Sequence, residues 1–155
     1  MRQPDFANLL KVLSRRVPDR PTLFEFFLNE GLYLRLAGEA AMPPADDTLA
    51  RKRVLLRAYA AAGYDYVTVQ GSAFSFPVKE HAHAKSRSMN ETALIADRAS
   101  FQAYPWPDPA DYDYSDLKSL ENDLPSGMKL IVWGPCGVLE NVMALVGYEN
   151  LCFIL

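Results

Sequence analysis

The sequence lacks the features that mark membrane and secreted proteins. None of its 155 residues belong to an apolar run of the length that spans a bilayer, about 20 residues. The first residues lead into an amphipathic helix and not into the apolar segment of a signal peptide. Two cysteines, Cys136 and Cys152, are too few for a disulfide framework. We therefore expect a cytoplasmic protein without a membrane partner.

The sequence also lacks an excess of basic residues. It has 16 Lys and Arg against 19 Asp and Glu, with a formal net charge of −3. A nucleic-acid-binding protein usually presents a basic face, so nucleic acid is not an expected partner. The short cluster Arg51–Arg53 lies at the start of a predicted helix, where we expect a solvated face. Half of the residues are hydrophobic, which is typical of a folded globular chain.

An apolar segment near the end of the chain is the clearest structural signal. Residues 128–133 form an almost unbroken apolar run, typical of a strand buried on both faces of a parallel sheet. A Gly/Pro turn follows at 134–137, and residues 138–146 have apolar positions at helical spacing. This is one βα unit. In parallel α/β folds, the loops at the carboxyl ends of strands build the functional site.

The rest of the chain is interpreted as earlier units of the same kind. Two further strands are predicted, at 22–28 and 64–70. Predicted helices alternate with the strands, at 5–15, 29–41, 49–62, 97–104 and 115–124. This order predicts a parallel sheet with right-handed helical crossovers.

Polar and aromatic side chains at the predicted carboxyl ends of strands are candidate substrate-binding residues. They are Asn29, Gln70, Ser72 and Trp133. Their position gives them a reason to line a site. Because no arginine or carboxylate accompanies them, binding is the expected role.

The long connection 71–90 holds the only two histidines, His81 and His83. Connections of this length are uncommon in compact domains and are often functional. On an extended strand the two rings would share a face, which suits a metal ion, although a zinc site needs three or four ligands. The alternatives are a substrate contact and a solvated loop.

Cys136 lies in the turn before the predicted helix 138–146. A helix N-terminus lowers the pKa of a thiol, which makes Cys136 a candidate nucleophile or ligand. The favoured alternative is a small buried residue that fills a tight turn.

Two further clusters have a structural and a functional interpretation. Aromatic residues beside prolines either stack on a flat ligand or pin a loop, and the second is favoured: Phe74, Phe76, Tyr104 and Trp106. An acidic run lacks the glycine and terminal glutamate of a calcium loop, so a solvated, helix-capping run is favoured: Asp108, Asp111, Asp113 and Asp116.

Several phrases of the sequence resemble the uroporphyrinogen decarboxylase superfamily. They are the segment 16–21 before a predicted strand, the Tyr-Pro-Trp-Pro-Asp-Pro phrase at 104–109, and 134–141 followed by the Gly-Tyr-Glu-Asn phrase at 147–150. The likeness is to divergent members, which include cobalamin-linked methyltransferases and decarboxylase-like proteins. It spans nearly the whole chain but only the N-terminal part of the family's domain.

The resemblance implies a (β/α)₈ barrel, a fold that typically needs about 250 residues. The chain, a single domain over 1–155, is therefore expected to be the N-terminal portion of a barrel that is incomplete in this chain. The apolar residues 151–155 also resemble the first turns of a helix more than a native terminus. We expect a piece truncated at its C-terminus.

Departures from the family pattern bear on the chemistry. The decarboxylases carry an Arg-rich phrase after the first strand, where this chain has 27–33 without arginine. They also carry an aspartate after the second strand, where this chain has Val69-Gln70-Gly71-Ser72. The resemblance then favours corrinoid-linked methyl transfer or decarboxylase-like chemistry on a small or tetrapyrrole-related substrate. It places the zinc ligands of the methyltransferases in the C-terminal half, outside this chain.

Two other functions stay open. One is a non-catalytic half-barrel that binds a ligand, forms a homo-oligomer or assembles with a complementary C-terminal half. The other is a genuine uroporphyrinogen decarboxylase with relocated residues. A corrinoid protein is a further expected partner of the methyltransferase branch, and the 155-residue chain by itself is expected to be inactive.

Overall fold

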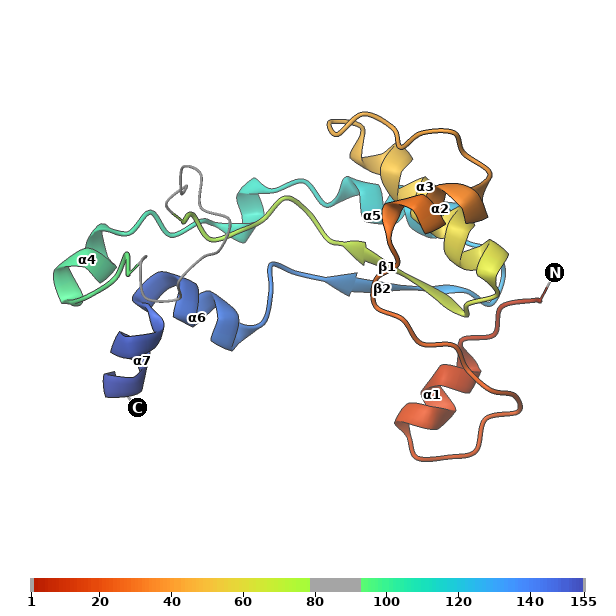
Figure 1. Ribbon diagram of the computed structural model, residues 1–155, viewed down its shortest axis with the longest axis horizontal. Coiled ribbons are helices and arrows are strands. Elements are labelled where there is room, and N and C mark those ends of the chain that lie inside the picture. Colours follow the sequence, from red (N-terminus) through yellow and green to blue (C-terminus); the bar gives the residue numbers. More distant parts are fainter. Residues whose placement is uncertain (1, 79–92, 155) are drawn as a thin grey trace. The chain divides into compact units, whose positions relative to one another are not determined.

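The computed structural model describes residues 2–78 and 93–154. The chain forms two compact units, each of which is built from separate stretches of the sequence (Figure 1). Unit 1 comprises Met1–Gly71 and Asp113–Trp133, and unit 2 comprises Ser72–Tyr112 and Gly134–Leu155. The fold is mixed α/β, with a small parallel sheet in unit 1.

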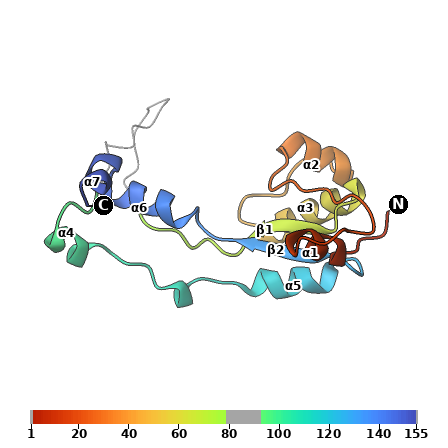
Figure 2. The ribbon, with the colours of Figure 1, turned by 90° about the horizontal axis from the view of Figure 1, so that it is seen from below.

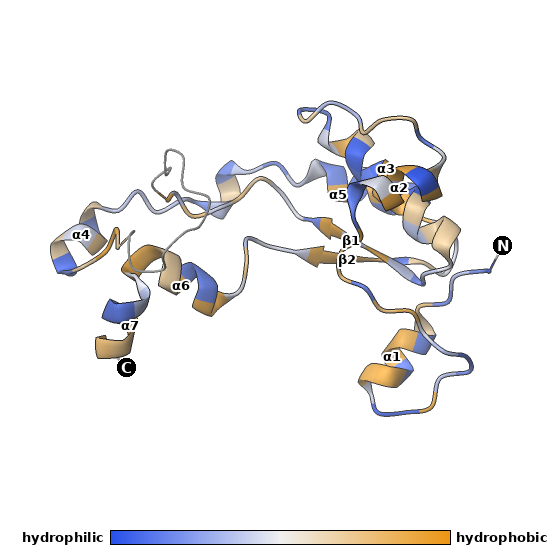
Figure 3. Ribbon diagram, viewed as in Figure 1, coloured by the Kyte–Doolittle hydropathy of each residue, from blue (hydrophilic) through white to orange (hydrophobic). Residues whose placement is uncertain are grey.

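The sheet of unit 1 pairs two parallel strands, β1 (Tyr66–Gln70) and β2 (Lys129–Trp133). The register runs from Tyr66 opposite Lys129 to Gln70 opposite Trp133. Apolar residues lie along both strands (Figure 3). The predicted strands at 64–70 and 128–133 and their parallel pairing are therefore confirmed.

A helix precedes each strand. α3 (Thr48–Ala62) begins where the Asp47 carboxylate accepts a hydrogen bond from the Ala50 amide, and it ends at Gly63 with a positive φ. α2 (Glu30–Ala37) lies beside α3, and α3 packs against β1 (Figures 1 and 2). α5 (Ser115–Asp123) also packs on α3 and leads into β2.

β1, and not β2, is the strand buried on both faces. Its first four residues are buried, whereas Val132 in β2 is 48% exposed. The sequence prediction of a doubly buried strand at 128–133 is thus wrong. The reason is that α3 and residues 23–28 pack on β1, whereas among the described elements only β1 packs closely on β2.

The predicted strand 22–28 is not a strand in the structure. It has no regular secondary structure, with a bend at Phe26, and forms no ladder with β1, because hydroxyl groups take several of its hydrogen bonds. Tyr66 Oη accepts from the Glu25 amide at 2.7 Å and donates to the Glu25 carbonyl at 2.9 Å. Thr68 Oγ1 donates to the Phe26 carbonyl at 2.6 Å. We call residues 23–28 the strap.

Two more tyrosines hold the strap. Tyr59 Oη of α3 lies 3.2 Å from the Phe26 carbonyl, and Tyr33 Oη of α2 accepts from the Leu28 amide at 2.8 Å. Burial raises the pKa of Tyr59 far above its ordinary value, so this hydroxyl stays a protonated donor. The same tyrosines belong to the apolar core of unit 1, where Val54, Ala58, Val67 and Leu120 are also buried.

An ion cluster fastens the N-terminal segment to the start of β1. The Asp65 carboxylate, 3% exposed, lies 2.5 Å from the Arg20 guanidinium and 3.5 Å from that of Arg2. It also accepts from the Asp5 amide at 2.8 Å. α1 (Ala7–Leu13) follows this segment, and of its predicted apolar face Leu9 is buried while Leu10 and Leu13 are exposed.

Unit 2 contains α4 (Arg98–Ala103), the 3₁₀ turn η1 (Pro109–Asp111), α6 (Val138–Val146) and α7 (Tyr148–Ile154). Its small core consists of Ile95, Tyr104 and Leu145. The Leu145 carbonyl accepts from the Leu94 and Ile95 amides, which ties α6 to the segment before α4. In the described part of the chain, no helix has the length and apolar character needed to cross a bilayer.

Candidate functional site

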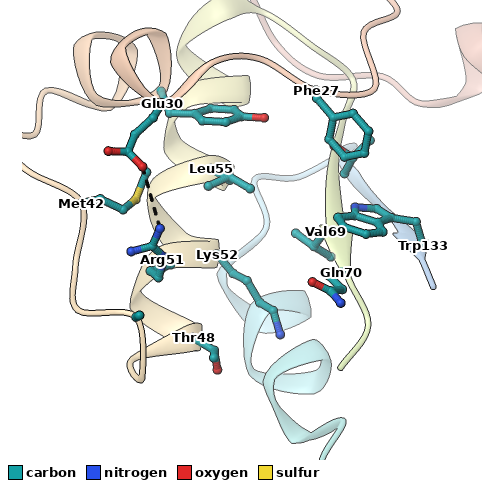
Figure 4. Close-up of a pocket in the computed structure, with 13 residues that line it drawn as sticks. Phe27, Glu30, Met42, Thr48, Arg51, Lys52, Leu55, Val69, Gln70 and Trp133 are labelled. Atoms are coloured by element: carbon teal, nitrogen blue, oxygen red, sulfur yellow. Dashed lines mark ion pairs between the residues drawn. The ribbon is translucent and has the colours of Figure 1, made fainter. Parts of the chain in front are cut away.

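A cavity of about 390 Å³ opens in unit 1 at the carboxyl ends of the two strands (Figure 4). Gln70 and Trp133, the register partners that end β1 and β2, both line it. Its other walls come from α2, α3 and the strap, through Glu30, Arg51, Leu55 and Phe27 among others. The strand ends thus border a cavity, which is the place where the α/β pattern predicts a site.

One face of α3 forms the floor of the cavity. Thr48, Arg51, Lys52 and Leu55 all line it, and their spacing of three and four residues places them on one side of the helix. The prediction that the Arg51–Arg53 cluster forms a solvated face is therefore wrong for its first two members. Arg51 and Lys52 are half-buried because α2 and α5 flank the first turn of α3.

The Arg51 guanidinium is held from one side. Nη1 donates to the Pro43 carbonyl at 2.7 Å, which fixes the plane of the group. Nη2 lies 3.9 Å from the Glu30 carboxylate, beyond hydrogen-bond distance (Figure 4). The Glu30 side chain is 65% exposed, and such exposed pairs contribute little to stability. Arg51 thus presents an N–H group that lacks a close acceptor in the described structure.

Lys52 is neutralised by its surroundings. Its ammonium lies 3.0 Å from the Asp116 carboxylate, whose Oδ2 also accepts from Thr48 Oγ1 at 2.5 Å. The Thr48 hydroxyl, and then Lys52, hold the pKa of Asp116 below its usual value. The Lys52 side chain is only 14% exposed. Of the two cations in the cavity wall, Arg51 is the one with an N–H group still available for a hydrogen bond to a ligand.

Aromatic rings form the opposite wall. Phe27 and Trp133 meet edge to face with their centroids 5.3 Å apart, and Phe26 meets Phe27 in the same manner at 4.8 Å. Figure 4 shows these rings on one side and the Glu30–Arg51 pair on the other, with Leu55 between them. The cavity therefore has one charged end and one aromatic end.

The structure brings only some of the predicted site residues together in the cavity. Gln70 and Trp133 line the cavity, as expected from their position. Asn29 instead caps α2, and its Oδ1 accepts from the Leu32 amide at 2.9 Å. Ser72 belongs to unit 2, where its hydroxyl accepts from the Phe74 amide at 3.1 Å. His81 and His83 lie outside the described residues.

Cys136 is exposed, so the favoured prediction of a buried turn residue is wrong. It lies in unit 2 just before Gly137, the N-cap of α6, and has a φ of 57°. Asn141 organises this turn, because its Nδ2 donates to the Gly137 carbonyl at 2.9 Å and to the Pro135 carbonyl. The turn is thus closed by a side-chain amide, and the thiol points away from the core.

The remaining clusters largely follow their structural interpretations. The Pro-flanked aromatics pin loops of unit 2: Tyr104 Oη donates to the Pro77 carbonyl and Trp106 Nε1 to the Phe101 carbonyl. Within the acidic run, Asp108 caps η1 by accepting from the Ala110 amide, and Asp113 accepts from the Ser115 amide just before α5. The prediction is wrong for Asp116, which is half-buried and contacts Thr48 and Lys52. Among the described residues, no group of three or more His, Cys, Asp and Glu side chains is placed to hold a metal ion.

Sequence reasoning missed the charged end of the cavity and Phe27. Charges in a first helical turn are usually solvated, so Arg51 and Lys52 gave no functional signal. The available signal was the spacing of Thr48, Arg51, Lys52 and Leu55, which places charged and apolar residues on one face. Phe27 was assigned to the interior of a strand that does not form.

The arrangement is suited to binding. Its polar groups are the Arg51 guanidinium, the Lys52 ammonium, the Gln70 amide, the Glu30 carboxylate and the hydroxyls of Tyr33, Thr48 and Thr68. The lining residues include neither a cysteine nor a histidine, and the Thr48 hydroxyl donates to an Asp116 carboxylate that is already paired with Lys52. Comparison with known proteins adds no assignment: the chain matched no protein-family model, no curated protein and no solved structure.

Proposed function

We propose that unit 1 binds a small organic substrate at the carboxyl ends of β1 and β2. The observation that carries this proposal is the cavity itself, in which Gln70 and Trp133 end neighbouring parallel strands beside a charged and an aromatic wall. Its volume of about 390 Å³ lies within the range of small-molecule sites, about 300–1,000 Å³.

In the full proposal, the chain is the N-terminal part of a (β/α)₈ barrel of the uroporphyrinogen decarboxylase superfamily. Two parallel strands, each preceded by a helix, agree with the first units of such a barrel. The sequence resemblance favours the branch that carries out corrinoid-linked methyl transfer or decarboxylase-like chemistry. In this proposal the cavity residues bind and orient the substrate.

The cofactors of that branch find no ligand set here. The resemblance assigns zinc to a His-x-Cys pair and a later Cys of the family's C-terminal half, and no comparable cluster occurs among the residues described in this chain. No step through zinc or a corrinoid is therefore derived for the cavity. The proposed role of the cavity residues is to bind the substrate.

A second candidate function is a non-catalytic half-barrel that assembles with a partner. It is supported by β2, which pairs with β1 alone among the described residues and whose Val132 is 48% exposed. Unpaired strand edges with apolar neighbours favour pairing with another chain. A genuine uroporphyrinogen decarboxylase is a third candidate, and failure to convert uroporphyrinogen would remove it.

The test of the binding proposal is a ligand-observed NMR screen of small carboxylates, amines and neutral aromatic compounds. We expect hits that are lost in the variant Leu55→Trp, which fills the cavity between its two ends. Lys118→Gln, on the exposed side of α5, is the matched control and should keep the hits. If no compound binds, or if Leu55→Trp keeps every hit, the cavity is not the site.

A further inference from the structure

We infer that the ligand of the unit 1 cavity is an organic anion with a planar apolar body, held by Arg51 in place of Glu30. This inference rests on the proposed function and adds the chemical class of the ligand. It combines three observations. Lys52 has a close carboxylate partner and Arg51 does not, the Arg51 guanidinium is oriented by a hydrogen bond, and an aromatic wall faces it (Figure 4).

The first step concerns charge. Lys52 has a carboxylate at 3.0 Å, and Thr48 fixes that carboxylate by a hydrogen bond to the same oxygen. Replacing this contact by a ligand would leave Asp116 without its cation, so Lys52 is a poor anchor. Arg51 has its nearest carboxylate, Glu30, at 3.9 Å on an exposed side chain. A ligand anion that displaces Glu30 returns that carboxylate to water at little cost.

The second step concerns geometry. The bond from Arg51 Nη1 to the Pro43 carbonyl orients the guanidinium before a ligand arrives. A carboxylate can then accept from Nη2 at hydrogen-bond distance, and a charge-assisted bond of this kind is stronger than a neutral one. The first turn of α3 adds positive potential at this position, because the helix N-terminus carries partial positive charge.

The third step concerns the body of the ligand. Opposite the guanidinium lie Phe27 and Trp133, and Leu55 and Val69 complete the apolar surface. An aromatic body placed there stacks or meets the rings edge to face. A two-ring carboxylate satisfies both ends at once, whereas an inorganic anion uses only Arg51 and a hydrocarbon uses only the rings.

The experiment compares three probes of one shape and different charge: 2-naphthoate, 2-naphthylmethanol and 2-naphthylmethylammonium. Affinities are measured by isothermal titration calorimetry on the full chain at low ionic strength. We expect 2-naphthoate to bind about tenfold or more tightly than the other two, the effect of one charge-assisted hydrogen bond. Arg51→Gln should remove this preference, and Glu30→Gln should tighten 2-naphthoate binding by about 2- to 5-fold.

Two controls separate charge from folding. Arg35→Gln removes an exposed arginine in the last turn of α2 and should leave all three affinities unchanged. Arg51→Lys keeps the charge at the site and should recover part of the preference, with circular-dichroism melting to verify that each variant is folded. Equal binding of 2-naphthoate to wild type and Arg51→Gln, or tighter binding of the ammonium probe, overturns the anion assignment while the cavity remains a site. Absence of binding by all three probes overturns the assignment of a planar organic anion, while the ligand-observed screen decides the proposed function separately.

Discussion

Asp65 shows how one buried charge organises the start of unit 1. Its carboxylate is 3% exposed and contacts Arg20, Arg2 and the Asp5 amide, so it joins three points of the N-terminal segment to β1. The Nε atoms of both arginines are buried and have no hydrogen-bond partner in the described structure. Loss of the Asp65 carboxylate therefore leaves the guanidinium groups of Arg2 and Arg20 with less negative charge beside them.

We predict that Asp65→Asn lowers the free energy of unfolding by about 3 kcal/mol, since removing one partner of a buried ion pair leaves the other charge uncompensated. Urea denaturation measures the effect. Asp19→Asn is the matched control: Asp19 pairs with Lys11 at 2.5 Å but is 72% exposed, so its loss should cost less than about 1 kcal/mol. Equal effects of the two substitutions would contradict the structural role of Asp65.

Asp116 makes the stability of unit 1 depend on pH in the acid range. The Thr48 hydroxyl and then Lys52 lower the pKa of the folded carboxyl below its usual range. A carboxyl with a lower pKa in the folded state contributes stability above its unfolded pKa, and this contribution is lost as the pH falls through the folded pKa. Asp116→Asn removes the contribution at every pH.

We therefore predict that the stability difference between wild type and Asp116→Asn is largest near neutral pH and shrinks below about pH 4. Urea unfolding at several pH values between 7 and 2.5 measures it. Other carboxylates titrate in both proteins and cancel in the difference. A difference that stays constant over this range would show that Asp116 acts through packing alone.

At the scale of elements, the strap is bound to unit 1 by hydroxyl groups and not by a strand ladder. Tyr66, Thr68, Tyr59 and Tyr33 supply these groups from β1, α3 and α2. Residues 66 and 68 of a strand share a face, so the strap crosses that face of β1. The arrangement places Phe27 in the cavity wall without extending the sheet.

We predict that Tyr66→Phe accelerates hydrogen exchange of the Glu25 amide roughly fivefold, because one hydrogen bond contributes about 1 kcal/mol and its loss raises local opening accordingly. Exchange of the amides in the β1–β2 ladder should be unchanged. Tyr33→Phe is the paired variant and should act on the Leu28 amide instead. Uniform acceleration across β1 and β2 by either variant would mean that the strap is part of the sheet's cooperative unit.

At the scale of the molecule, unit 1 contains the larger core and the cavity. Every buried residue of that core lies within Met1–Gly71 or Asp113–Trp133. The two segments also meet, because the Gly71 amide donates to the Trp133 carbonyl at 3.0 Å. Among the described residues, the core of unit 2 is built around Ile95, Tyr104 and Leu145.

We predict that a chain joining Met1–Gly71 to Asp113–Trp133 through about four Gly and Ser residues unfolds cooperatively and keeps the affinity of the full chain for 2-naphthoate. Circular-dichroism melting and calorimetry measure these properties. The same chain with Val54→Asp, which places a charge at a position 1% exposed, is the unfolded control. A joined chain that resembles this control would show that unit 1 depends on unit 2 for folding.

The candidate site was only partly accessible from the sequence. Gln70 and Trp133 were found because a strand's carboxyl end follows directly from where its apolar run stops. Arg51 and Lys52 were assigned to solvent, since nothing near them in the sequence indicates that α2 and α5 flank them. The burial of Cys136 was predicted wrongly because it depends on neighbours that are distant along the chain.

The sequence by itself determined the local elements of this protein: α3 with its Asp47 cap and Gly63 end, β1 and β2, and their parallel order. These follow from periodicity, caps and breakers that act over a few residues. Only the tertiary structure decided that 23–28 forms a hydroxyl-bound strap, that β1 is the doubly buried strand, and that Arg51 faces Trp133 across a cavity. Each of these outcomes depends on groups far apart in the chain competing for the same hydrogen bonds and apolar surface, and local patterns do not encode that competition.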